Sequence, residues 1–193
     1  MSVSIKVLYG TNIKSIGSAF VDKKNFVSNG IIISVKNSGT KLICTISLKA
    51  GKNLKGTSSS EKLNGTTNSD IFYGGKGNDT ITGKNGRDVV VYDKTAWGKD
   101  VIAKTAGRMT LLFKDLKSAD LTQKTSGKNL IITRKSDKNQ TITVKNYATD
   151  THNIVFASGM TAFEKYLKAS TPTTKQTSAA RNEVWKKAGL ASA

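Results

Sequence analysis

The sequence predicts an all-β protein built around a short parallel β-roll. A nine-residue pattern runs in constant phase through residues 56–91, with an acidic residue at the sixth position and an apolar residue at the eighth position of every copy. Strand-like runs rich in β-branched residues lie on both sides of these repeats. We therefore expect a roll between an N-terminal β segment and a C-terminal β cap, followed by a short helix and a flexible tail.

Residues 1–54 are expected to form the N-terminal β segment. Ser2–Val7 alternates polar and apolar residues, and Ile31–Val35 and Leu42–Leu48 are β-branched runs bounded by turn residues. Cys44 lies in the last of these runs and is expected to be an ordinary strand residue. Because it is the single cysteine of the chain, an internal disulfide is excluded.

The repeats themselves occupy the second predicted segment, residues 55–108. The fullest copy is Gly74–Thr82, which reads GGKGNDTIT, and weaker copies begin at Gly56, Gly65 and Gly83. Glycine allows the backbone to turn through positive φ and leaves room for carbonyl groups to converge. A hairpin loop is also rich in glycine, asparagine and aspartate, but it gives no reason for a constant period. Stacked turns of a roll are therefore favoured, with these eighth-position residues in a thin core: Leu63, Phe72, Ile81 and Val90.

The acidic positions indicate calcium. Calcium binds about six to eight oxygens from carboxylates and backbone carbonyls, and one short turn supplies only half of them. Two turns stacked on the same edge would complete the shell, and successive repeats alternate edges. Asp70 is therefore expected to share an ion with Asp88, and Asp79 with Asp100, which ends a further turn after a short insertion.

One or two good calcium sites are expected rather than a long series. Glu61 could pair with Asp79 from the other side, but its turn keeps no glycine of the pattern except Gly56. The candidate calcium-binding residues are Gly65, Asn68, Asp70, Gly74, Gly75, Gly77, Asp79, Gly83, Gly86, Asp88, Gly98 and Asp100.

This run resembles the RTX family, the hemolysin-type calcium-binding repeats of secreted bacterial proteins. The family pattern GGxGxDxUx, in which U is apolar, is matched in full at residues 74–82. The next copy has Lys84 in place of one glycine, and the preceding copy has Thr66 and Asn68 where glycines are usual. The resemblance implies a secreted, extracellular module that stays unfolded in the calcium-poor cytosol. Such a module passes a type I exporter C-terminus first and folds in extracellular calcium.

Residues 109–168 are expected to form a C-terminal β cap with a helix. This segment resembles the β-module that follows the repeats in many hemolysin-type proteins. A roll exposes unpaired backbone groups and apolar surface at its open end, which a cap would cover. The expected strands lie at 110–113, 129–133, 141–144 and 154–156, and helical spacing is found at 160–169.

The final segment, residues 169–193, is expected to be a linker and a secretion tail. Ser170–Ala179 is rich in threonine and serine and contains the single proline, and Ala180–Ala191 could form one short amphipathic helix. The last five residues, GLASA, resemble the small and apolar C-terminus that type I exporters recognise.

Strong positive charge is the least expected property of the chain. Lysine and arginine outnumber aspartate and glutamate by 31 to 13, which gives a net charge of +18. A diffuse basic surface is usually solvated, but it also attracts anionic polymers and membranes. An adhesin-like protein that binds anionic cell-surface polymers or lipid headgroups is therefore an alternative function. Nucleic-acid binding is disfavoured, because the few aromatic residues are not interleaved with a basic stripe.

The sequence carries no catalytic set, so the chain is not expected to be an enzyme. His152 is the single histidine and is expected in a surface turn. Because the HExxH zinc motif needs two histidines, that chemistry is excluded. A GxSxG elbow and a phosphate-binding loop are also absent. No run approaches the roughly 18 apolar residues of a membrane span. We expect a monomer whose partners are calcium and the exporter.

Overall fold

The computed structural model describes the backbone of residues 26–28, 31–38 and 41–48 and the full residues 50–103, 106–147 and 152–190. The first three ranges form an antiparallel sheet in the order β1-β2-β3. Its strands are β1 (Phe26–Ser28), β2 (Ile31–Ser38) and β3 (Lys41–Leu48). This confirms the two strands predicted from β-branched runs, whereas the strand predicted at Ser2–Val7 lies outside the described residues.

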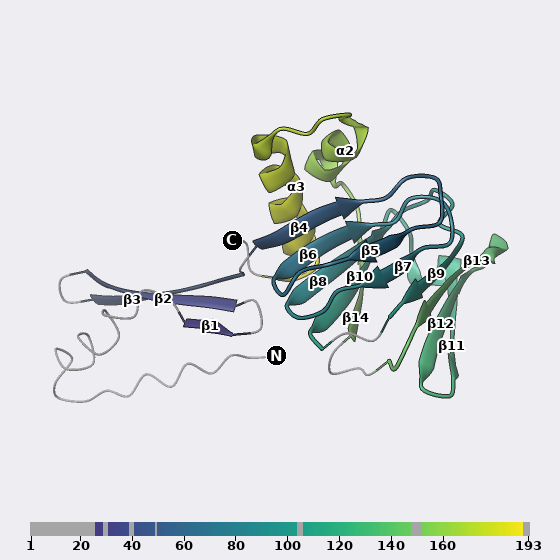
Figure 1. Cartoon of the computed structure of the whole chain (residues 1–193), viewed down its shortest axis with the longest axis horizontal. Coiled ribbons are helices and arrows are strands. Elements are labelled where there is room, and N and C mark those ends of the chain that lie inside the picture. Colours follow the sequence, from purple (N-terminus) through teal and green to yellow (C-terminus); the bar gives the residue numbers. More distant parts are fainter. Residues whose placement is uncertain are drawn as a thin grey trace.

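Two further sheets form the roll and its extension (Figure 1). The first has five parallel strands in the order β14-β10-β8-β6-β4. They are β4 (Ala50–Lys55), β6 (Ser69–Tyr73), β8 (Arg87–Tyr92), β10 (Arg108–Lys114) and β14 (His152–Ala157).

The second sheet has six strands in the order β11-β12-β13-β9-β7-β5. Its repeat strands are parallel, and the hairpin strands of the cap extend it, since β13 pairs parallel with β9 while β12 and β11 follow antiparallel. A one-turn 3-10 helix, η1 (Ser118–Asp120), precedes β11. The strands are β5 (Lys62–Asn64), β7 (Thr80–Thr82), β9 (Lys99–Ile102), β11 (Leu121–Ser126), β12 (Asn129–Arg134) and β13 (Asp137–Val144).

The register confirms that each repeat pairs with the repeat after next. Leu63 pairs with Ile81 in one sheet, and Phe72 pairs with Val90 in the other. The eighth-position residues therefore stack in columns between the sheets, where Phe72, Ile81 and Val90 are fully buried. Burying one such side chain stabilises the fold by about 1.5–3 kcal/mol.

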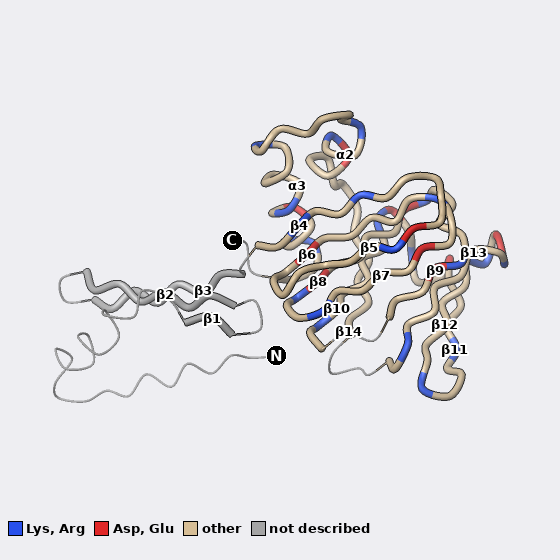
Figure 2. Tube along the Cα trace, viewed as in Figure 1, with Lys and Arg blue, Asp and Glu red and all other residues tan. Residues whose placement is uncertain are grey.

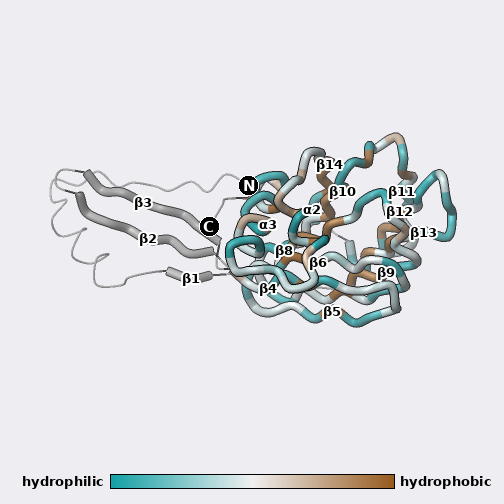
Figure 3. The backbone as a smooth tube through the Cα atoms, turned by 90° about the horizontal axis from the view of Figure 1, so that it is seen from above, coloured by the Kyte–Doolittle hydropathy of each residue, from teal (hydrophilic) through white to brown (hydrophobic). Residues whose placement is uncertain are grey.

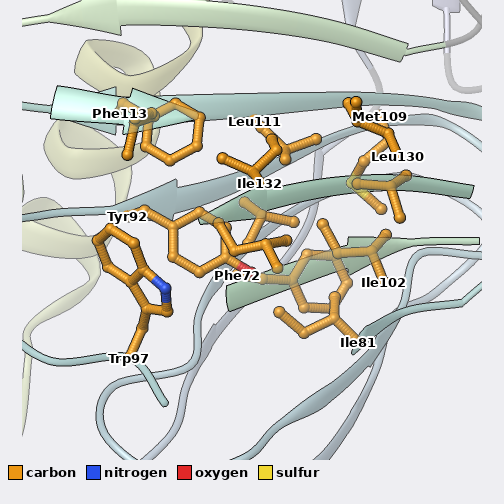
Figure 4. Packing of buried hydrophobic residues seen from close by; sticks show 14 of the residues in the cluster. Phe72, Ile81, Tyr92, Trp97, Ile102, Met109, Leu111, Phe113, Leu130 and Ile132 are labelled. Carbon is orange, nitrogen blue, oxygen red and sulfur yellow. The ribbon is translucent and has the colours of Figure 1, made fainter. Parts of the chain in front are cut away.

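The same core continues from the repeats into the cap. Figure 4 shows Leu130 and Ile132 of the cap near Phe72, Ile81 and Ile102 of the roll. An aromatic cluster of Tyr92, Trp97 and Phe113 lies at one end of this core, with ring centroids 5.4–6.4 Å apart. The cap and the roll thus share one hydrophobic core, in keeping with the brown tube segments along the strands in Figure 3.

Two helices cover the outer face of the five-stranded sheet (Figure 1). From α2 (Thr161–Lys168) and α3 (Thr174–Lys187), the side chains of Phe163, Val184 and Trp185 pack in one cluster with Val89, Val91 and Leu112. Because the centre of this sheet is buried on both faces, the central strands β8 and β10 carry continuous hydrophobic runs rather than alternating ones. No helix in the described ranges is long and apolar enough to span a membrane.

Three details differ from the sequence-based predictions. The last helix begins at Thr174 rather than Ala180, because Thr173 and Gln176 form a capping box, so the predicted linker is wrong for residues 174–179. Strand β11 was not predicted, since only its first residue is buried. His152 is buried rather than in a surface turn, because it begins β14 opposite Met109.

The predicted domain boundaries stay a prediction, but several strands cross or join across them. Strand β4 starts before the boundary at residue 54 and pairs with β6 of the roll. Strand β10 begins at Arg108 and, with β14, extends the five-stranded sheet from the cap side. The tail helix α3 packs on that sheet as well.

Candidate metal centre

The acidic residues of the turns form two rows on opposite edges of the roll (Figure 2). Asp70 and Asp88 lie at the starts of β6 and β8, and Glu61, Asp79 and Asp100 lie at the starts of β5, β7 and β9. The four aspartates have at most 1% of their surface exposed. Buried carboxylates at repeated positions require partners, because an unpaired buried charge is costly.

Each row is connected by a repeated hydrogen bond between stacked turns. The backbone N–H of Asp70 donates to Oδ1 of Asp88 across 18 positions, at 2.9 Å. On the other edge, the N–H of Asp79 donates to Oδ1 of Asp100 across 21 positions, also at 2.9 Å. The structure therefore brings together both predicted pairs. It also shows the pair that the sequence allowed on the other side of Asp79, in which the N–H of Glu61 donates to Oδ1 of Asp79 at 2.9 Å.

Backbone carbonyls approach the carboxylates at the first glycine of the first two turns. A Cβ atom at Gly65 would lie 2.7 Å from Asp70 Oδ2 and 2.8 Å from the carbonyl oxygen of Gly83, which belongs to the next turn on the same edge. A Cβ at Gly56 would likewise meet Glu61 Oε2, at 2.6 Å, and the carbonyl of Gly74. Oxygen atoms of two stacked turns thus converge over a glycine, and a side chain would fill that space.

The later glycines of the pattern are needed for close stacking. Gly77 and Gly86 have φ values of 105° and 106°. A Cβ at Gly77 would meet the carbonyl of Ser59, and a Cβ at Gly86 would meet that of Asn68. These glycines are therefore required both for their left-handed backbone and for contact with the neighbouring turn. The other candidate glycines with positive φ are Gly75 and Gly98.

Three carboxylate oxygens in these rows are buried without a hydrogen-bond partner among the described residues. They are Oδ2 of Asp79, Asp88 and Asp100. Burial raises the pKa of Asp88 to about 8, that of Asp100 to about 7, and that of Asp79 above its ordinary value. Burial thus disfavours the ionised form of each of these carboxyl groups unless a cation lies beside it.

The donor set fits a hard cation such as calcium. Its members are carboxylate and carbonyl oxygens, which calcium prefers. Within the described ranges, no three histidine, cysteine or acidic side chains gather at one point. Backbone carbonyls would therefore have to complete any shell, as the convergence at Gly65 and Gly56 allows.

Comparison with known proteins agrees with this geometry. Residues 55–90 match the family model described as the RTX calcium-binding nonapeptide repeat, in four copies. The chain carries RTX repeats over this range. Its repeats are of a calcium-binding class, so calcium is its cofactor.

One solved structure similar to this RTX protein is a subunit, R3, of a mannuronan C5-epimerase from Azotobacter vinelandii. The match has 17% sequence identity and a TM-score of 0.25, and it covers 64% of this chain and 82% of that one. No curated protein matches the RTX chain.

The first two RTX repeats differ from the later ones in how their carboxylates are satisfied. In the turn that begins at Gly65, the N–H and hydroxyl of Thr66 both donate to the Asp70 carboxylate. In the turn before it, Thr57 contacts Glu61 in the same way. In the sequence, these threonines stand only as departures from the glycine of the pattern. Their hydroxyl groups, at a position otherwise held by glycine or lysine, were the signal that could have revealed this role.

Three lysines of the RTX turns lie at the surface. Lys76, Lys84 and Lys99 are exposed to solvent. Bulk salt screens exposed charges, so these lysines weaken a cation site less than their proximity in sequence would imply.

Proposed function

We propose that this RTX protein is a calcium-dependent folding and export module of a secreted protein. The observation that carries the proposal is the set of buried Oδ2 atoms of Asp79, Asp88 and Asp100, which accept no hydrogen bond from the described chain. A bound cation would supply the positive charge that these atoms lack.

The residues present suggest where calcium would be held. Asp70 and Asp88, with the carbonyl of Gly83, would hold one ion, and Asp79 and Asp100 would hold another. The gap between Glu61 and Asp79 offers a third, weaker position. Because the stacked turns do not exist in the unfolded chain, the binding free energy is folding free energy. Dissociation constants on the order of 10⁻⁴–10⁻³ M, as in extracellular modules, would keep the chain unfolded in the cytosol.

The proposed cellular role follows from this calcium dependence. The chain would cross a type I exporter C-terminus first while unfolded and then fold outside the cell as a monomer. The support is the resemblance of the GLASA end to exporter signals and of the repeats to those of secreted proteins. In this role the module binds and folds and is not an enzyme.

A calcium titration of the full chain tests the proposal. Calcium is added to chelator-treated protein while far-UV circular dichroism is followed. We expect a cooperative gain of β structure with a midpoint on the order of 10⁻⁴–10⁻³ M. Magnesium is the matched control, since it demands a smaller octahedral shell and should give little change at the same concentration. A β-rich spectrum that is present without calcium and unchanged through about 10 mM would overturn the proposal.

A second candidate function is binding to anionic polymers through the basic surface. A hollow of about 440 Å³ has four cationic residues in its lining, Lys94, Lys117, Arg134 and Lys135, against two acidic ones, Asp115 and Asp120. Nη1 of Arg134 is held by the carbonyl of Lys94, at 2.8 Å, and the guanidinium lies 5.4 Å from the ring centroid of Trp97. Its Nε and Nη2 make no hydrogen bond in the described chain and could bind a carboxylate or sulfate.

Heparin retention tests this second candidate. We expect the protein to be retained at low ionic strength and released as salt rises, with earlier release for Arg134→Gln. Lys186→Gln, on the exposed side of α3, changes the charge equally and is the control. Equal elution of the two variants would assign any retention to diffuse charge and not to the hollow.

A further inference from the structure

The second residue of a repeat decides how the carboxylate at the sixth position is satisfied. In the Gly65 turn, the backbone N–H of Thr66 donates to Asp70 Oδ2 at 2.6 Å, and its hydroxyl lies 3.0 Å from both carboxylate oxygens. The N–H of Lys52 donates to Oδ1 from the neighbouring strand. Asp70 is therefore fully engaged by groups of the protein.

The first repeat shows the same arrangement with a longer acid. The N–H of Thr57 donates to Glu61 Oε2 at 2.7 Å, and the Thr57 hydroxyl donates to Oε1 at 3.0 Å. Since aspartate and glutamate differ in length, the shared element is the threonine and not the acid. The hydroxyl also accepts a hydrogen bond from the backbone two residues later, from Ser59 in one turn and Asn68 in the other.

The next two repeats have a different second residue and a different outcome. Gly75 and Lys84 occupy the second position with φ values of 90° and 67°, in the left-handed region. The acids of these turns, Asp79 and Asp88, each keep a buried Oδ2 that accepts no hydrogen bond from the described chain. One molecule thus contains both kinds of turn, stacked on the same two edges.

We infer that threonine at the second position takes the place of a cation, and that glycine or lysine there leaves the carboxylate open to one. The inference rests on the proposed calcium-dependent function and assigns an order to its sites. Asp79 and Asp100 belong to turns without a second-position threonine, so their gap is the tightest calcium site. The gap of Asp70 and Asp88 and the gap of Glu61 and Asp79 each contain one threonine-bound carboxylate and are weaker.

Substitution at Lys84 tests the inference with a matched pair. Where the turn takes the backbone conformation of the Gly65 turn, Lys84→Thr would place a hydroxyl beside Asp88, so that both carboxylates of the Asp70–Asp88 gap are engaged by the protein. Lys84→Val has nearly the same shape, the same loss of charge and the same backbone strain, but no hydroxyl. Isothermal titration calorimetry of the full chain with calcium is expected to show one ion fewer for Lys84→Thr than for Lys84→Val. Equal numbers of ions for the two variants would overturn the inference.

The reverse substitution keeps the test decisive if Lys84→Thr does not fold. Thr66→Gly removes the hydroxyl group from the Asp70 carboxylate and is expected to tighten calcium binding by up to about tenfold, the effect of one ordinary hydrogen bond. Thr66→Ser keeps the hydroxyl and should bind as the wild type does. Unchanged binding in Thr66→Gly would contradict the inference. Failure of the wild-type protein to bind calcium would instead overturn the proposed function.

Discussion

The backbone N–H of Asp79 donates to Oδ1 of Asp100 at 2.9 Å, although three extra residues separate this pair compared with the pair Asp70 and Asp88. The insertion is absorbed before β9, near Trp97, whose ring is buried against Tyr92. The ladder of turns therefore continues without interruption past the last full repeat. The sites at its end can be tested individually.

Loss of either charge in the Asp79–Asp100 gap is expected to weaken calcium-driven folding. Asp100→Asn and Asp79→Ala should each raise the calcium midpoint by tenfold or more, since a hydrogen bond to a charged group contributes about 1.5–3 kcal/mol. Asp88→Ala should raise it as well. Circular dichroism titrations measure the midpoints. Asp137→Asn, in the β12–β13 hairpin, is the control and should leave the midpoint unchanged.

An alanine at Gly86 is expected to disturb stacking of the turns. The new Cβ would meet the carbonyl of Asn68, and φ is 106°. We expect a loss of about 1–3 kcal/mol from backbone strain, and more from the clash. Gly127→Ala is the control, because Gly127 has a φ of 58° but nothing within 4 Å of its Cβ position. Thermal melting in saturating calcium measures both; equal melting temperatures would show that strain alone matters.

The pKa values of the open carboxylates predict opposite pH trends with and without calcium. Burial raises the pKa of Asp88 to about 8 and of Asp100 to about 7, against an ordinary 3.8. A carboxyl group with a raised folded-state pKa binds more protons when folded, so stability without calcium falls as pH rises from about 4 to about 8.

Two measurements check these trends. In calcium-free buffer we expect more β structure near pH 5 than near pH 8. With calcium present, protons compete for the same oxygens, so the calcium midpoint should rise as pH is lowered over this range. A midpoint that does not change with pH would contradict the assignment of these carboxylates as ligands.

The helix α3 is expected to be part of the stable fold. Trp185 is fully buried in the cluster that joins α3 to the five-stranded sheet. Trp185→Ala should therefore lower the free energy of unfolding in calcium by about 3–5 kcal/mol. Denaturant unfolding measures this loss. Lys186→Ala, at the next and exposed position, should change it little.

Much of the roll could be predicted because its pattern is periodic. A period of nine with an apolar eighth position determines both the pairing of Phe72 with Val90 and the burial of these residues. The acidic sixth position likewise predicted the pairs Asp70–Asp88 and Asp79–Asp100, which the hydrogen bonds now show.

The rest depends on contacts that a local pattern does not contain. Strands β10 and β14 join the sheet of the roll through parallel pairing between segments that are distant in the sequence. Strand β11 is polar because it is the edge strand of its sheet. The role of Thr66 follows from the position of its hydroxyl beside Asp70. The sequence shows only that this residue is not glycine and does not show that contact.

The contact between α3 and β4 joins the last helix to an edge strand of the five-stranded sheet. Arg181 donates to the carbonyl of Gly51 at 3.1 Å and to Oδ1 of Asn53 at 3.2 Å, and Asn53 donates to the carbonyl of Thr177. Under the proposed C-terminus-first export, α3 would emerge before the strands of the roll, and β4 would emerge after them. Val184 and Trp185 would then stay uncovered until β10, β8 and β6 appear, and the hydrogen bonds of Arg181 would form only with β4. These hydrogen bonds between α3 and β4 could form only after β4 had been released. Once formed, they would oppose return of the chain into the exporter.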